Sequence, residues 1–136
     1  MAYKHSELTE EIISAFYHVY HALGYGFLER VYENALAIEL RKRGHVVTQQ
    51  APITIMYSGQ PVGEYYADIL VDGLVIVEMK ALDGIVPEHE AQLLNYLRGS
   101  NIDVGLLLNA GPKPEIKRKI YDTARLKTHA AQGAQV

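Results

Sequence analysis

The chain of 136 residues contains no cysteine and no tryptophan. Without cysteine it can form neither a disulfide nor a thiolate metal site. None of its apolar runs approaches the ~20 residues that a transmembrane helix needs, and the N-terminal stretch MAYKHSELTEE is polar, unlike a secretory signal. We therefore expect a cytoplasmic protein with no membrane partner.

Basic charge is also scarce. The chain has 13 Lys and Arg against 16 Asp and Glu, a net charge of -3, whereas a dedicated nucleic-acid coat protein would usually be basic. Apolar residues make up 49% of the sequence and charged residues 21%, which is typical of a folded globular protein. At this length we expect a single domain over residues 1–136, with a disordered tail at 127–136.

The periodicity of apolar residues predicts the order of elements. Helical spacing runs through 7–23 and 27–43. Val, Ile and Thr are enriched over 45–57, 62–71 and 74–80, which predicts strands. A helix over 87–99, an apolar strand over 104–108 and a last helix from about Pro114 to Leu126 should follow. The order α-α-β-β-β-α-β-α predicts an α/β fold with a mixed four-stranded sheet flanked by helices.

Polar side chains interrupt two of these strands. Asp68 lies inside one strand, and Glu78 and Lys80 end the next, on one face because side chains alternate along a strand. Asp68 can oppose Glu78 only if the hairpin loop has three residues, 72–74. A two-residue loop would turn Glu78 to the other face. Because glycine readily adopts a left-handed conformation, Gly73 favours the three-residue loop, and we predict this loop or an equivalent β-bulge.

Two opposed carboxylates repel, and one would be protonated unless a cation joined them. Mg²⁺ typically takes one or two carboxylates together with water and phosphate oxygens. Asp68, Glu78 and the backbone carbonyl of Met79 offer such a shell. Lys80 at the same pocket would orient or deprotonate a water molecule, or stabilise phosphate charge. A Glu-x-Lys pair alone is common at strand ends, so the prediction depends on the whole set.

Two helices carry further candidates. Gln92 and Tyr96 lie four residues apart on one helix face, as do Glu29 and Glu33 on another. His89, one turn before Gln92, is either a site residue or an ordinary exposed histidine of the first helical turn.

With these residues the sequence resembles the PD-(D/E)XK nuclease superfamily, and more narrowly its GxxExxY proteins. The naming motif is present as GFLERVY over 26–32, and the similarity extends through YADILVDGLVIVEMKAL and HEAQLLNYL to VGLLLN, about residues 20–110. One position departs from the superfamily's name, since Ala67 replaces the proline before the aspartate, a change that the superfamily tolerates widely.

The resemblance implies a restriction-endonuclease-like three-layer fold and a phosphodiesterase site that uses Mg²⁺ or Mn²⁺. Asp68 and Glu78 would be metal ligands and Lys80 the catalytic lysine. Gln92 and Tyr96 match the accessory motif of RecB-like exonucleases, which helps to hold metal, water or phosphate.

The resemblance also implies a helix glutamate at the site. Glu29 belongs to the naming motif, whereas Glu33 has the spacing before a helix-ending glycine that Holliday-junction resolvases use. We expect Glu33 to lie closer to the metal, as a ligand, with Glu29 in support. His89 would be a further metal or phosphate contact.

The first functional hypothesis is a metal-dependent nuclease that hydrolyses phosphodiester bonds in DNA. The alternatives are a catalytically silent nuclease-fold module that binds nucleic acid or a partner protein, and a metallohydrolase acting on another phosphate ester in a closed pocket. Cutting both strands would need two sites and hence a homodimer. Tyr25, Tyr32, Tyr65 and Tyr66 are candidates for base stacking, although we expect most tyrosines to serve in packing. The sequence does not decide whether the substrate is DNA or RNA, or whether it is cut from its ends or at internal positions.

Overall fold

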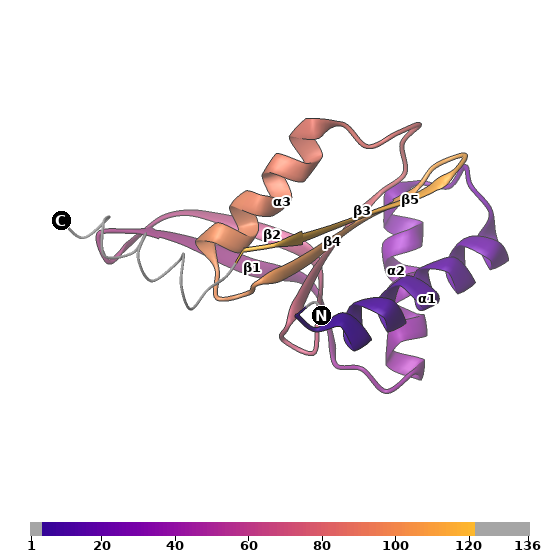
Figure 1. Cartoon of the computed structure of the whole chain (residues 1–136), viewed down its shortest axis with the longest axis horizontal. Helices are drawn as coiled ribbons and strands as arrows, with labels where there is room; N and C mark the ends of the chain where they lie inside the picture. Colours follow the sequence, from indigo (N-terminus) through magenta and orange to yellow (C-terminus); the bar gives the residue numbers. More distant parts are fainter. Residues whose placement is uncertain (1–3, 122–136) are drawn as a thin grey trace.

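The computed structural model describes residues 4–121 and contains three helices and five strands (Figure 1). None of these helices combines the length and the apolar character needed to cross a membrane. In chain order the elements are α1 (Ser6–Leu23), α2 (Glu29–Lys42), β1 (Val47–Tyr57), β2 (Gln60–Val71), β3 (Val75–Lys80), α3 (Pro87–Gly99), β4 (Val104–Ala110) and β5 (Pro114–Ile120).

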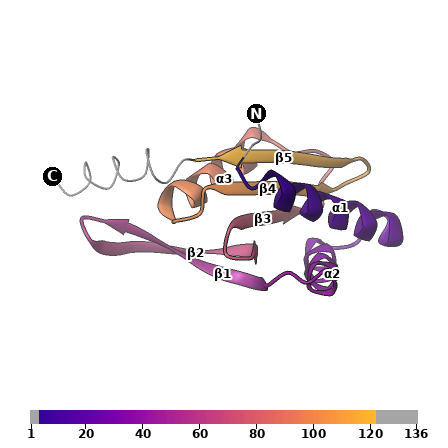
Figure 2. The same cartoon turned by 60° about the horizontal axis from the view of Figure 1, so that its bottom comes forward.

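The strands form one mixed sheet in the order β1-β2-β3-β4-β5. Only β3 and β4 are parallel, and α3 is the crossover between them. One apolar cluster lies between the sheet and the helices α1 and α2, and a second lies between the sheet and α3. The helices therefore cover both faces, as Figures 1 and 2 show, and the expected α/β three-layer fold is confirmed.

The prediction of a last helix from Pro114 is wrong for the described part of that segment. Residues 114–120 form β5, which pairs antiparallel with β4 and makes the sheet five-stranded instead of four-stranded. The sequence PEIKRKI is rich in residues that also favour helices, but its side chains alternate between apolar Ile116 and charged neighbours. Charged side chains are typical of edge strands, because they discourage further strand pairing. The remaining residues of the predicted helix, and the tail 127–136, lie outside the described residues.

The three-residue hairpin loop is confirmed. Val71 pairs with Val75, which leaves Asp72, Gly73 and Leu74 in the loop. Asp72 and Gly73 have φ angles of +53° and +67°, and the Leu74 N–H donates to the Val71 carbonyl at 2.9 Å. The left-handed pair makes a tight turn, and the extra residue sets the register that puts Asp68 opposite Glu78.

The β2–β3 pairing is short, and its end creates a fork. It runs only from Val71 to Ile69, opposite Val75 to Val77, whereas β1 and β2 stay paired as far as Tyr57 and Gln60. The far part of the β1–β2 hairpin, residues 54–66, projects beyond the other strands (Figure 2). We call these residues the arm. Asp68 and Glu78 therefore lie where β2 leaves β3.

Candidate active site

The two strand carboxylates close the fork by accepting hydrogen bonds from backbone N–H groups of the opposite strand. The Asp68 N–H donates to Glu78 Oε2 at 2.8 Å, and the Met79 N–H donates to Asp68 Oδ2 at 2.8 Å. Both amides lie beyond the last backbone pairing of β2 with β3, so the side chains satisfy donors that the sheet leaves open. The predicted meeting of Asp68 and Glu78 is therefore present in the structure.

Glu78 is held in an unfavourable electrostatic position. It is 7% exposed, and its pKa is raised from the usual 4.5 to about 8, first by burial and then by the charge of Asp68. The hydrogen bond from the Asp68 N–H and the charge of Lys80 lower this pKa only in part. At neutral pH, with no additional cation, the site therefore binds a proton.

The first glutamate of α2 reaches this site. Gly26 has a φ of +112°, which favours glycine, and the Tyr32 hydroxyl donates to the Gly24 carbonyl at 2.5 Å and accepts the Phe27 N–H at 3.3 Å. This local structure puts Glu29 at the start of α2, beside the end of β3 in Figure 1. Its pKa is raised by burial; Lys80 lowers it and Asp68 raises it, so Glu29 lies within electrostatic reach of both.

Glu33 is connected to Asp68 by a residue that sequence reasoning missed. The buried Glu33 carboxylate accepts hydrogen bonds from Gln49 Nε2 at 2.8 Å and Gln50 Nε2 at 3.0 Å. The same Gln50 Nε2 lies 3.3 Å from Asp68 Oδ1. Glu29 also acts on the pKa of Glu78. This arrangement puts Glu29 within electrostatic reach of Lys80 and gives Glu33 a link to Asp68 through Gln50.

The helix α3 contributes Tyr96 from the face of the sheet opposite to α2. Tyr96 is 6% exposed, and its pKa is raised to about 12 by burial and then by the charges of Glu78 and Asp68. Gln92, one turn earlier, is exposed. His89 Nδ1 accepts the Val86 N–H at 3.3 Å, which stabilises the start of α3. Tyr96 is thus at the site, whereas the contact of His89 is local.

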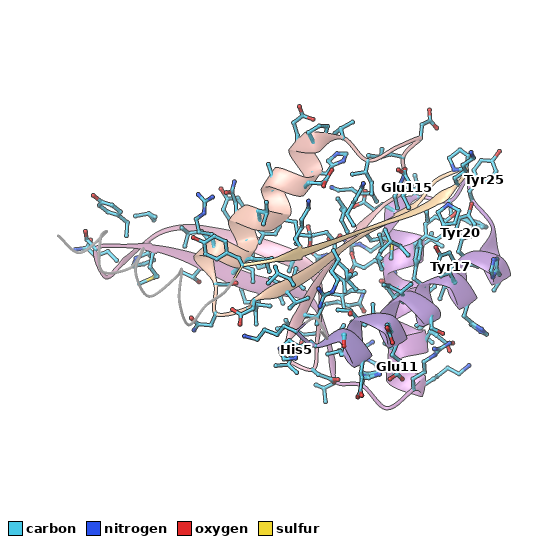
Figure 3. All side chains as sticks on the ribbon, in the orientation of Figure 1. His5, Glu11, Tyr17, Tyr20, Tyr25 and Glu115 are labelled. Atoms are coloured by element: carbon cyan, nitrogen blue, oxygen red, sulfur yellow. The ribbon has the colours of Figure 1, made fainter. Side chains whose placement is uncertain are left out.

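The loop after Lys80 is held by another residue that sequence reasoning missed. Buried Asn109, which pairs with Lys80 in the β3–β4 ladder, accepts the Leu82 N–H at 2.9 Å and donates to the Leu82 carbonyl at 3.0 Å. Asn109 also donates to Glu115 Oε1 at 3.1 Å, and Glu115 lies at the site end of the molecule in Figure 3. The signal was a polar residue ending the apolar run VGLLLN.

Metal-binding capacity centres on two side chains. Within residues 4–121, no group of three or more His, Asp or Glu side chains is arranged to hold a metal ion. Asp68 and Glu78 lie together, and the raised pKa of Glu78 marks uncompensated negative charge. A pair of carboxylates suits a cation that keeps most of its ligands as water and phosphate.

The comparisons with known proteins agree with this fold. The family model for the PD-(D/E)XK nuclease superfamily matches residues 6–119, which includes all three helices and nearly all of β5. No curated protein and no solved structure matches the chain.

Proposed function

The chain belongs to the PD-(D/E)XK nuclease superfamily, and we propose that it is a metal-dependent nuclease that hydrolyses phosphodiester bonds in DNA. The observation that carries this proposal is the buried Glu78 carboxylate, opposite Asp68 and within electrostatic reach of Lys80. An isolated structural pair of carboxylates would cost stability without compensation. Such pairs are characteristic of functional sites.

The naming motif supports a narrower assignment. Gly26, Glu29 and Tyr32 act together, since the glycine and the tyrosine shape the segment that presents the glutamate. We propose on this basis that the chain is one of the GxxExxY proteins of the superfamily.

The residues fit Mg²⁺ or Mn²⁺. Asp68, Glu78 and the Met79 carbonyl would hold the ion, with Glu29 or Glu33 as the further carboxylate. When bound, the ion would polarise the phosphate and lower the pKa of a water molecule. Because Mg²⁺ needs only one or two protein carboxylates, the absence of a three-residue cluster in residues 4–121 does not conflict with this assignment.

The remaining side chains have roles that follow from their chemistry. Lys80 would orient the attacking water and stabilise charge that develops on the phosphate. Tyr96, whose raised pKa keeps the hydroxyl protonated, would donate a hydrogen bond to a phosphate oxygen or a bound water. Exposed Gln92 and half-buried His89 would contact the substrate backbone nearby.

Cleavage of labelled DNA with Mg²⁺ or Mn²⁺ tests the proposal. We expect wild type to cut, and Asp68→Asn and Lys80→Ala each to lower kcat by roughly 10²–10⁴-fold. Asp72→Asn removes a carboxylate from the other end of the same hairpin and should leave kcat unchanged. Equal cutting by wild type, Asp68→Asn and Lys80→Ala would contradict the site assignment.

A catalytically silent module that binds nucleic acid or a partner protein is the second candidate. It is favoured by the hydrogen bonds that the Asp68 and Glu78 carboxylates accept from backbone N–H groups, which give both side chains a structural role in the fork. In that case wild type would bind DNA without cutting it, and Lys80→Ala would change only the affinity.

A further inference from the structure

The arm differs in composition from the rest of the chain. Over residues 54–66, TIMYSGQPVGEYY, it contains no lysine, arginine or histidine and one glutamate. Several of its large apolar side chains are exposed: Met56, Tyr57, Val62, Tyr65 and Tyr66. Without a cation, the arm carries no positive charge to attract phosphates, whereas its exposed aromatic rings can stack on bases.

One residue of the arm adjoins the candidate site. Tyr65 pairs with Ile53 across the hairpin, and its ring centroid lies 5.3 Å from that of Tyr96, with the rings tilted by 43°. Tyr96 lies within electrostatic reach of Glu78 and Asp68. The Tyr65 ring is therefore one aromatic ring away from the carboxylates at the fork.

The two neighbouring tyrosines differ in exposure. Tyr96 is 6% exposed and belongs to the apolar cluster beneath α3, whereas Tyr65 is 48% exposed and is outside both clusters. Packing of the core explains why position 96 has an aromatic ring. It does not account for the Tyr65 ring, which is held against Tyr96 and left half open to solvent.

We propose that Tyr65 is a stacking platform for an unpaired nucleobase next to the scissile phosphate, so that the substrate is a strand with unpaired nucleotides. This inference rests on the proposed nuclease function. A base within a duplex is covered on both faces by its neighbours, and only an unpaired base can offer a face to an aromatic side chain. Lys80, together with a divalent cation held by Asp68 and Glu78, would bind the phosphate, and Tyr65 would stack on the adjoining base.

The neighbouring tyrosine provides a matched control. Tyr66 has the same side chain and a similar exposure of 53%, but it pairs with Pro52 and points to the opposite face of the arm. Its hydroxyl donates to Glu64 at 2.6 Å within the arm. Tyr65→Leu and Tyr66→Leu therefore remove the same aromatic ring from the two faces of one hairpin.

The test is a titration of single-stranded DNA containing 2-aminopurine, whose fluorescence falls when it stacks, with Ca²⁺ present as a cation of similar ligand preference. We expect wild type and Tyr65→Phe to quench the fluorescence. Tyr65→Leu should abolish the quenching and weaken binding by about 5- to 150-fold. Tyr66→Leu should bind as wild type does. Blunt duplex DNA of the same sequence should bind equally to wild type and Tyr65→Leu.

Two results would overturn the inference and leave the nuclease proposal standing: cutting by wild type with equal binding by both leucine variants, or equal weakening of duplex and single-strand binding in Tyr65→Leu. A wild type that neither binds nor cuts any DNA would overturn both proposals. Circular dichroism melting of each variant excludes unfolding as the cause, and Tyr65→Phe, which lacks only the hydroxyl, separates stacking from hydrogen bonding.

Discussion

The two ends of the β2–β3 hairpin place carboxylates in opposite electrostatic surroundings. At the turn, Asp72 Oδ2 lies 2.7 Å from His45 Nδ1 and Asp72 Oδ1 accepts the Val46 N–H at 2.8 Å. His45 Nε2 lies 3.0 Å from Glu11 Oε1, as an ion pair, not an aligned hydrogen bond. Glu11, at this end, is far from Glu115 at the site end in Figure 3. Both carboxylates at this end thus lie beside His45, whose pKa they raise.

The fork at the other end lacks this balance. Glu78 faces Asp68, with Glu29 also contributing negative charge and only Lys80 opposing it. The pKa values follow the difference. Burial would raise the pKa of Asp72, but the bond to His45 lowers it overall, whereas the pKa of Glu78 rises to about 8. The turn is arranged for stability and the fork is not, which is the pattern expected where function costs stability.

Glu78→Gln should show the largest effect. The amide keeps the shape and accepts the Asp68 N–H, but it removes the negative charge that a divalent cation needs. We expect kcat for DNA cleavage with Mg²⁺ to fall by roughly 10³-fold. Isothermal titration with Mn²⁺ gives an independent readout, in which the variant should bind far more weakly than wild type and Asp72→Asn. Unchanged Mn²⁺ affinity in Glu78→Gln would contradict the role of this carboxylate.

The pH dependence of stability should follow Glu78. Because its pKa is raised from 4.5 to about 8, the folded protein holds a proton over this range that the unfolded chain releases. The contribution of Glu78 to metal-free stability should therefore be greatest below pH 4.5 and should be lost as the pH rises to about 8, by several kcal/mol. Urea unfolding in EDTA across this range measures it, and Glu78→Gln should flatten the curve.

His45 adds a separate contribution in the same direction. Burial lowers its pKa, but the hydrogen bond to Asp72 and the neighbouring carboxylate of Glu11 raise it overall above 6.5. Its stabilisation is therefore present below pH 6.5 and is lost as the pH rises through the raised value. His45→Gln should remove only this upper part of the curve. If Glu78→Gln left the fall of stability between pH 4.5 and 6 unchanged, the assignment of this fall to Glu78 would be wrong.

At the turn, Asp72→Ala should destabilise the protein by about 2 kcal/mol. It removes the acceptor of the Val46 N–H and the partner of His45, and it puts alanine at a φ of +53°. Asp72→Asn tolerates that backbone and keeps an acceptor, so it should cost less than half as much. Chemical denaturation of both variants measures the difference. Neither should change kcat, and a loss of activity in the stable asparagine variant would break the distinction between the two ends.

Local rules predicted much of this hairpin. The loop length followed from counting residues, because only an odd loop lets Asp68 oppose Glu78, and Asp-Gly supplied the left-handed turn. The β5 strand could not be predicted in the same way. Its residues also favour helices, and its pairing with β4 is a tertiary choice. Asn109 likewise acts through Leu82, far along the chain, so no local pattern gives its role.

Gln50 was unpredictable for a related reason, and it gives the smallest expected effect. It has a φ of +51° inside β1, which is a conformation that costs a non-glycine residue about 1 kcal/mol. Its amide joins Glu33 to Asp68. Gln50→Gly relieves the backbone and removes the amide, so stability should hold while kcat falls about tenfold, ~1.4 kcal/mol. Ser58→Gly, also at +51° but in the turn of the arm, is the control and should leave kcat unchanged. If Gln50→Gly and Ser58→Gly had equal kcat, the hydrogen bonds of Gln50 would serve only the stability of the fold. The strained backbone at Gln50 would then have no role in activity.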